Sequence, residues 1–152
     1  MKLSAYTDYT LRTLIFLARR AGRPATIQDI AELHGLSRHH LGKVVMDLAH
    51  GGLVRTTRGR GGGIVLGREP ERINIGAVVR GTETGFDMAA CFNATDRVCA
   101  HQGCCGLKAV LEAATAAYLA RLDALTLADL APAPGPSLVI SADANSLFAL
   151  AG

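Results

Sequence analysis

Two short helical patterns joined through Gly35 constrain the fold of this chain more than any other feature. Residues 27–34 carry apolar side chains at helical spacing and follow Thr26, a residue that caps helices well. A second helix is predicted over residues 38–49, with Ser37 as its cap. Because a glycine between two short helices suits a tight turn, the pattern predicts a helix-turn-helix, whose second helix enters the major groove of DNA.

A longer amphipathic helix is predicted before this unit. Apolar residues recur at helical spacing over residues 6–21, and Gly22-Arg23-Pro24 ends the pattern. Thr7 is the expected N-cap, and Asp8 in the first turn has the charge that a helix N-terminus favours.

A β-hairpin with a glycine-rich tip is predicted after the helices. Two β-favouring runs, residues 53–57 and 64–66, flank the sequence Arg-Gly-Arg-Gly-Gly-Gly. A nucleotide-binding P-loop is excluded, because it runs from a strand into a helix and needs a Gly-Lys-Ser/Thr ending. Arg58 and Arg60 at this tip suit contacts with phosphates or the minor groove.

The first part of the chain also carries the positive charge. Residues 1–80 hold 13 Lys and Arg against 6 Asp and Glu, a net charge of +7, whereas residues 81–152 hold 3 against 7, a net charge of −4. A basic first part favours a polyanion as partner. With a further short helix over residues 73–80, we predict that residues 1–80 form a winged helix-turn-helix domain that binds double-stranded DNA. The side chains expected to contact DNA lie at the start of the recognition helix and at the hairpin tip: Ser37, Arg38, His40, Lys43, Arg58 and Arg60.

The sequence offers no candidate for a membrane segment or a leader. No apolar run approaches the ~18–20 residues that span a bilayer. Asp8 and Arg12 interrupt the N-terminal apolar run, and no small-residue cleavage site follows it. We therefore expect a cytoplasmic protein without a membrane partner, and in the cytoplasm clustered cysteines more often bind metals or react with oxidants than form structural disulfides.

All four cysteines lie within residues 91–105, at Cys91, Cys99, Cys104 and Cys105. A metal or cluster site, local disulfides and a redox sensor would each explain this concentration. Structural zinc sites usually pair cysteines two to four residues apart, and only Cys99 and Cys104 fit that spacing. Thiolates on one loop suit an iron–sulfur cluster, for which three of these cysteines and one ligand from elsewhere would complete four.

A long helix with one apolar stripe is predicted after the cysteines. A helix of about 28 Å is too long for the small first domain to cover on both faces, so we expect it to pack against its copy in a two-fold homodimer. The alternative is a core helix within one chain. The stripe consists of Leu107, Leu111, Ala114, Tyr118, Leu122 and Leu125.

The expected fold is thus mainly α, a winged helix-turn-helix with a long C-terminal dimerisation helix. Residues 81–106 form the cysteine-bearing cluster loop, residues 107–131 the dimerisation helix and its end, and residues 132–152 a tail of unknown role. No catalytic constellation such as Ser-His-Asp is visible, so an enzyme is not expected.

Several motifs resemble a known family. They are Tyr6-Thr7-Asp8-Tyr9-Thr10-Leu11-Arg12, Gly35-Leu36-Ser37-Arg38-His39-His40-Leu41, the hairpin from Val54 to Gly67, Ile73-Asn74-Ile75-Gly76-Ala77-Val78-Val79-Arg80, the cysteines, and Thr126-Leu127-Ala128-Asp129-Leu130. Over about residues 1–131 the chain is similar to the nitric-oxide-sensing repressors of a family of winged-helix iron–sulfur regulators that also includes IscR.

The resemblance implies a homodimer with one 4Fe-4S cluster per subunit. The family's three cysteine ligands fall on Cys91, Cys99 and Cys105, and the family's Cys-x-Leu-Lys motif selects Cys105 over Cys104. A carboxylate in the first helix, supplied by the partner subunit, is the fourth ligand in such proteins, and its position matches Asp8. The alternative for Asp8 is a purely structural role at the helix start, paired with Arg12.

Two features depart from the family pattern: the gap between Cys91 and Cys99 is wider than in the family, and Cys104 is an additional thiol. His101 is a further candidate ligand. IscR-like members carry a histidine a few residues after the third cysteine. Lys108 stands there in this chain, which favours the 4Fe-4S form over the alternative 2Fe-2S form.

The expected function is a nitric-oxide-responsive transcriptional repressor, in which the cluster controls the binding of a homodimer to an inverted-repeat operator. One alternative keeps the DNA-binding domain and makes the cysteines a thiol or zinc sensor of another signal. The other is an iron–sulfur electron-transfer protein, against which the basic helix-turn-helix stands.

Overall fold

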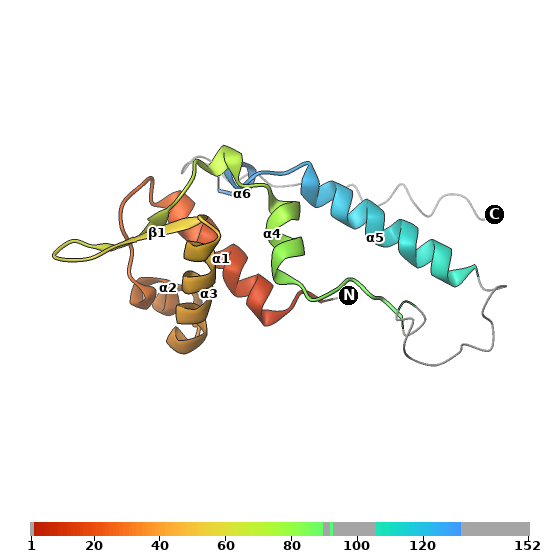
Figure 1. Ribbon diagram of the computed structural model, residues 1–152, viewed down its shortest axis with the longest axis horizontal. Helices are drawn as coiled ribbons and strands as arrows, with labels where there is room; N and C mark the ends of the chain where they lie inside the picture. Colours follow the sequence, from red (N-terminus) through yellow and green to blue (C-terminus); the bar gives the residue numbers. More distant parts are fainter. Residues whose placement is uncertain (1, 90–91, 93–105, 132–152) are drawn as a thin grey trace.

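The computed structural model describes residues 2–89, 92 and 106–131, and in this part the chain is mainly helical. Helices α1, α2 and α3 lead into a two-stranded hairpin, and η1, α4, α5 and α6 follow (Figure 1). The hairpin and the far end of α5 lie at opposite ends of the molecule in Figure 1. The bounds are α1 Ala5–Arg19, α2 Ile27–His34, α3 Arg38–His50, β1 Val54–Thr57, β2 Gly63–Leu66, η1 Pro70–Arg72, α4 Ile75–Thr82, α5 Leu107–Asp123 and α6 Leu127–Leu130.

The start of α1 differs from the prediction. Ser4, not Thr7, is the N-cap, and its hydroxyl accepts a hydrogen bond from the Thr7 backbone N–H at 3.1 Å. Thr7 lies inside the helix with its side chain fully buried. The helix also ends at Arg19, two residues earlier than expected, because Ala21 and Gly22 both adopt positive φ. Asp8 lies in the first turn, as predicted.

The helix-turn-helix forms as the sequence predicts. Thr26 caps α2 in a reciprocal arrangement with Asp29, in which each side chain accepts a hydrogen bond from the other residue's backbone N–H. Gly35 follows in the left-handed conformation, with φ 62°, which a residue with a side chain adopts only at a cost. Ser37 occupies the N-cap position of α3, but its side chain makes no capping hydrogen bond.

The hairpin is a wing attached to this helical body. Strands β1 and β2 pair antiparallel from Val54 opposite Leu66 to Thr57 opposite Gly63. Ala25, between α1 and α2, pairs with Ile64 through backbone hydrogen bonds in both directions, at 3.0 and 2.7 Å. The base of the wing is therefore held by three chain segments, whereas its tip projects from the body (Figure 1).

The end of the described chain returns to this body. The Leu127 N–H donates to the Ile73 carbonyl at 2.8 Å, the Ile75 N–H donates to the Leu125 carbonyl at 3.0 Å, and the Leu127 side chain is fully buried. Short helix α6 packs against η1 and α1. The core of the described residues contains side chains from α1 to α4, both strands and α6, among them Leu14, Leu17, Ile30, Leu41, Val44, Val54, Ile64, Ile73, Val79 and Leu127.

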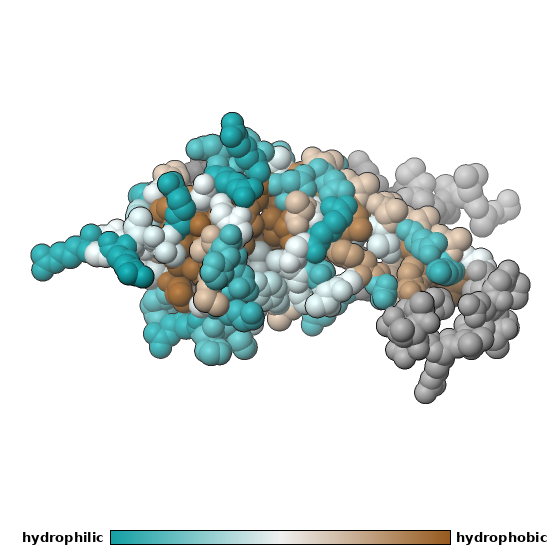
Figure 2. Space-filling view, in the orientation of Figure 1, coloured by the Kyte–Doolittle hydropathy of each residue, from teal (hydrophilic) through white to brown (hydrophobic). Residues whose placement is uncertain are grey.

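Helix α5 is largely exposed. Every one of its residues is described, and none is buried; Leu107 and Val110 are 57% and 64% exposed. Apolar side chains lie open along it in Figure 2. The predicted stripe begins on this helix, but Leu125 falls beyond its end, in the turn before α6. No helix in the described residues is long and apolar enough to cross a bilayer.

Candidate functional site

The first candidate surface is the exposed side of α3. Ser37, Arg38, His40 and Lys43 are all exposed, while the opposite side of the helix is buried in the core through Leu41, Val44, Val45 and Leu48. The Arg38 guanidinium donates to Gln28 Oε1 on α2 at 2.9 Å, which joins the two helices of the motif at their surface. The four predicted contacts on α3 are thus available to a partner.

The tip of the wing carries the remaining two predicted contacts. Arg58 and Arg60 are exposed, and hydrophilic side chains extend from the tip at the left of Figure 2. Gly59 and Gly61 have φ values of 102° and 77°, so the tip uses backbone conformations that favour glycine. Figure 1 shows α2, α3 and the wing at the same end of the molecule.

His40 also connects α3 to α1. Its ring centroid lies 6.3 Å from that of Tyr9 on α1 and 5.9 Å from that of His39. Tyr9 follows Asp8 directly in the sequence. The predicted fourth iron ligand is therefore one residue away from an aromatic side chain that contacts the predicted recognition helix.

Asp8 is a surface carboxylate in the first turn of α1. Its side chain is 41% exposed and pairs with Arg12 one turn later, with 2.9 Å between Arg12 Nε and Asp8 Oδ2. Both charges act on His34 of α2. Burial lowers the pKa of His34, the charge of Arg12 lowers it further, and the charge of Asp8 raises it. The Asp8 carboxylate is thus accessible to a metal ion, and Arg12 would compete with the metal for it.

The predicted cluster cysteines lie outside the described residues. This applies to Cys91, Cys99, Cys104 and Cys105, and also to His101. Within residues 2–89, 92 and 106–131, no group of three or more His, Cys, Asp or Glu side chains could hold a metal ion. The chemistry of the donor set nevertheless fits an iron–sulfur cluster, since three thiolates are available from one segment and Asp8 offers an exposed carboxylate.

Glu83, where the chain leaves α4 toward the cysteines, is joined to the start of α1. Its Oε1 accepts a hydrogen bond from the Ser4 backbone N–H at 2.8 Å. Partial burial disfavours the charged carboxylate, but hydrogen bonds from Thr7 and Ser4 outweigh this and lower the pKa of Glu83. The C-terminal end of α4 is therefore joined to the N-cap of the helix that carries Asp8.

A second connection between α1 and α3 was not visible in the sequence. The Tyr6 hydroxyl donates to Asp47 Oδ2 at 2.6 Å, and Lys43 Nζ lies 3.4 Å from the same oxygen. Desolvation, then the hydrogen bond to Asp47 and its charge, raises the pKa of Tyr6 to about 12. The hydrogen bond from Tyr6, aided by Lys43, lowers the pKa of Asp47. Because 41 residues separate Tyr6 from Asp47, no local pattern could have indicated this contact.

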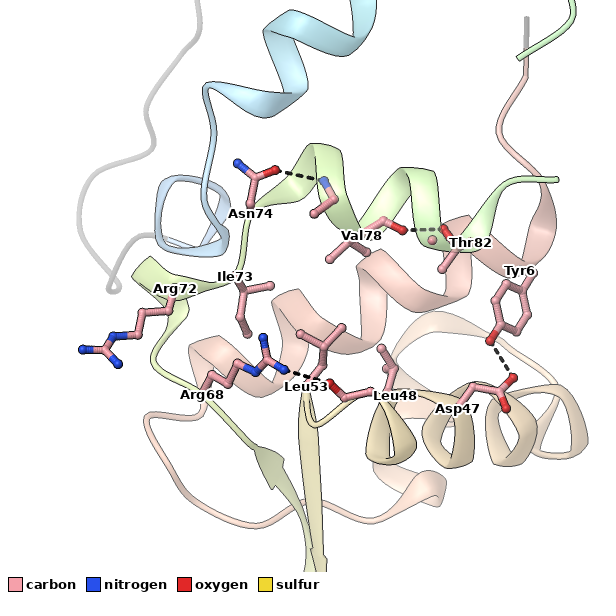
Figure 3. A pocket seen from close by; sticks show the side chains of 13 residues that line it. Tyr6, Asp47, Leu48, Leu53, Arg68, Arg72, Ile73, Asn74, Val78 and Thr82 are labelled. Carbon is pink, nitrogen blue, oxygen red and sulfur yellow. Dashed lines mark hydrogen bonds between the residues drawn. The ribbon is translucent and has the colours of Figure 1, made fainter. Parts of the chain in front are cut away.

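A cavity of about 390 Å³ opens beside this hydrogen bond (Figure 3). Leu48, Ile73 and Val78 contribute buried apolar walls. At its other side, Arg68 donates to the Gly51 carbonyl at 3.0 Å. Figure 3 shows the Tyr6–Asp47 pair at one side of this space and Arg68 at the other.

Comparisons with known proteins agree with this arrangement. Residues 3–133 match the family model of Rrf2, described as an iron-dependent transcriptional regulator. The HTH-type transcriptional regulator NsrR of Bacillus subtilis (strain 168) is 54% identical over 131 residues, which cover 86% of this chain and 90% of that protein. The NsrR of Bacillus licheniformis is 50% identical over 131 residues, covering 86% and 92% respectively.

Solved structures share the fold. The structure of CymR (YrzC), the global cysteine regulator of B. subtilis, has a TM-score of 0.67 and 32% identity, covering 86% of this chain and 96% of that one. The structure of IscR from T. potens has a TM-score of 0.66 and 30% identity, with coverages of 86% and 85%. The predicted mainly helical winged helix-turn-helix is therefore confirmed. The chain belongs to the Rrf2 family of iron-dependent, DNA-binding transcriptional regulators, and it is not an enzyme.

Proposed function

We propose that this chain is a homodimeric repressor whose iron–sulfur cluster makes operator binding responsive to nitric oxide. Asp8 and Tyr9 support the proposal most directly. An accessible carboxylate suited to iron stands in the first turn of α1, and the next residue contacts the recognition helix through His40. A change at Asp8 can thus alter the position of α3.

Three thiolates and one carboxylate would hold the cluster. We assign Cys91, Cys99 and Cys105 of one subunit and Asp8 of the partner subunit as ligands of one 4Fe-4S cluster per subunit, with a 2Fe-2S cluster as the alternative. When bound, such a cluster supplies iron that nitric oxide attacks. A carboxylate oxygen is a harder ligand than a thiolate, so Asp8 would hold the iron less firmly than the three cysteines.

The Asp8 carboxylate has an alternative partner within its own chain. Arg12 lies one turn along the same helix and pairs with the carboxylate at 2.9 Å. Without its link to the other subunit, α1 is free to shift relative to α3 at the Tyr9–His40 contact. A hundredfold loss of operator affinity corresponds to only ~2.7 kcal/mol, which the loss of one cross-subunit bond can supply.

The exposure of α5 supports the homodimer. A helix of 17 residues, about 26 Å long, has no buried side chain within the subunit. Alanine, leucine and valine side chains along it leave apolar surface that a second copy of the helix would cover. Two recognition helices related by a two-fold axis would read an inverted-repeat operator.

We assign a separate task to each region. Residues 1–80 bind DNA, residues 81–106 hold the cluster, and residues 107–131 form the dimer. The DNA contacts are made by exposed side chains of α3 and the wing: Ser37, Arg38, His40, Lys43, Arg58 and Arg60.

The proposal is tested on protein purified without oxygen. We expect iron and sulfide in equal amounts, strong visible absorbance, and operator binding that nitric oxide weakens about a hundredfold, or ~2.7 kcal/mol. Asp8→Ala should retain the iron on three cysteines yet bind the operator as weakly as the nitric-oxide-treated protein. Asp87→Ala, which removes another exposed carboxylate, is the matched control.

Three results would reject this function. They are purified protein without iron, zinc in place of iron, and operator binding that nitric oxide leaves unchanged. Zinc would indicate the thiol or zinc sensor instead, and binding to DNA that does not weaken with salt would contradict a phosphate-contacting regulator.

A further inference from the structure

One oxygen of the Asp47 carboxylate interacts with a residue of α1 and with a residue of α3, the predicted recognition helix. Asp47 Oδ2 accepts a hydrogen bond from the Tyr6 hydroxyl at 2.6 Å and lies 3.4 Å from Lys43 Nζ. Tyr6 belongs to the same first turn of α1 as Asp8, whereas Lys43 and Asp47 lie one turn apart on α3. A displacement of the first turn of α1 would therefore change what the Asp47 carboxylate binds.

The two interactions of Asp47 differ in strength. The hydrogen bond from Tyr6 is short and involves a charged acceptor, so it is of the stronger kind. The Lys43 ammonium nitrogen lies farther from the carboxylate, at 3.4 Å, and the Lys43 side chain is 69% exposed. With Tyr6 in place, its hydroxyl uses part of the hydrogen-bonding capacity of the Asp47 carboxylate. The Lys43 ammonium therefore remains available to another anion such as a DNA phosphate.

The surroundings allow Tyr6 to leave. The cavity of about 390 Å³ adjoins the Tyr6–Asp47 pair, with Gly81 and Thr82 of α4 beside it. The Tyr6 side chain lines this space, so it has room on that side to move away from Asp47. Once the hydroxyl is gone, the full charge of Asp47 faces Lys43 and competes with DNA for it.

We propose that Tyr6 is a positioning residue that acts through Asp47 to keep Lys43 available for DNA. This inference rests on the proposed function, in which α1 carries the cluster ligand Asp8. Formation of the Tyr6–Asp47 bond favours operator binding, and its loss draws Lys43 back onto the protein. The coupling thus forms a second route from α1 to α3, beside the Tyr9–His40 contact.

The test is a mutant cycle read out by DNA affinity at several salt concentrations. Tyr6→Phe removes only the hydroxyl, and we expect roughly three- to tenfold weaker operator binding with a salt slope shallower by about 1, as for the loss of one phosphate contact. In a Lys43→Gln background the same change should have no further effect. In an Asp47→Asn background it should also have none, because the competing charge is already absent.

The control is Glu71→Ala, a change at an exposed residue of η1 outside α1, α3 and the wing, which should bind DNA like the original protein. A thermal unfolding curve establishes that each variant is folded. Unchanged affinity and salt slope in Tyr6→Phe would overturn the inference. An equal loss in the Lys43→Gln background would also overturn it, since the hydroxyl would then act on α3 in general and not through Lys43.

The outcomes separate this inference from the proposed function. If nitric oxide has no effect on the original protein, the sensing function fails, while the cycle still decides whether Tyr6 acts through Lys43. If nitric oxide acts on the original protein, its effect on Tyr6→Phe should be smaller by the same three- to tenfold factor. An undiminished response would show that Tyr6 has no part in signalling and would overturn the inference.

Discussion

The Asp123 carboxylate at the end of α5 accepts two hydrogen bonds from the Arg80 guanidinium of α4, at 2.5 and 2.6 Å. Asn74, the N-cap of α4, donates from its side-chain amide to the Asp123 carbonyl at 2.7 Å. Both ends of α4 are thus tied to the residue at which α5 stops. The orientation of α5 relative to the DNA-binding body depends on this contact.

Close packing at this contact predicts that any side chain at position 76 destabilises the fold. A Cβ at residue 76 would lie 2.9 Å from the Asp123 backbone nitrogen and would overlap the Asp123 carboxylate. We expect Gly76→Ala to lower the free energy of unfolding by ~1–3 kcal/mol in a denaturant titration. Gly81→Ala, in the same helix, meets no atom within 4 Å and should be neutral or stabilising by ~0.5–1 kcal/mol. Equal effects of the two changes would contradict the contact.

The charge of Asp123 predicts a dependence of stability on pH. The hydrogen bond from Arg80 lowers the pKa of Asp123 below its ordinary value of 3.8. A carboxylate with a lowered pKa stabilises the fold at any pH above its unfolded value and loses this contribution as the pH falls through its folded value. Asp123→Asn should therefore melt at a lower temperature than the original chain at neutral pH, and the difference should shrink below about pH 4. A constant difference down to pH 2 would exclude a role for the charge, and Asp87→Asn is the control.

The burial of α6 predicts a large effect of a mutation near the end of the described chain. Leu127 is fully buried in the core shared with α1 and η1. Leu127→Ala should cost ~2–5 kcal/mol of unfolding free energy, measured by denaturant titration. Leu33→Ala, at a leucine that is 65% exposed, should cost little. Two separate unfolding transitions in the Leu127 variant would show that α6 is not part of one cooperative core.

The wing predicts a contact with the DNA backbone. Arg60 is exposed at its tip, on glycine-rich backbone that can follow the duplex. Arg60→Ala should weaken binding to operator and unrelated DNA by similar factors and make the salt slope shallower by about 1. Glu71→Ala, at an exposed position outside the wing, is a control for surface changes. A loss restricted to the operator would mean that Arg60 reads bases and not phosphates.

Local sequence patterns were sufficient for the helix-turn-helix and the wing. Thr26, Gly35 and the glycine-rich tip determine conformation within a few residues, so their effects are visible without knowledge of the fold. The same reasoning was wrong at the start of α1, because Ser4 and Thr7 are both good caps and the burial of Thr7 decides between them. It also began α4 at residue 73, whereas Asn74 caps a helix that starts at Ile75.

Contacts between distant residues were beyond prediction. The Tyr6–Asp47, Ser4–Glu83 and Arg80–Asp123 contacts join residues 41, 79 and 43 positions apart, and each depends on how the helices pack. The burial of Leu127 is of the same kind, since the five-residue motif around it shows a capped helix but not its partner. The predicted iron ligands remain predictions, with Asp8 the one among them whose surroundings are described.

The return of the chain to its own beginning has a consequence for protein engineering. Asn74 and Thr126 pair across the body as an isolated bridge, and Leu127 fills the core beneath η1 and α1. A chimera that joins the first 82 residues of this chain to the sensory half of another regulator would leave a hole where residues 122–130 pack. A successful graft must exchange both segments together, because helix α6 is as much a part of this folded body as the wing is.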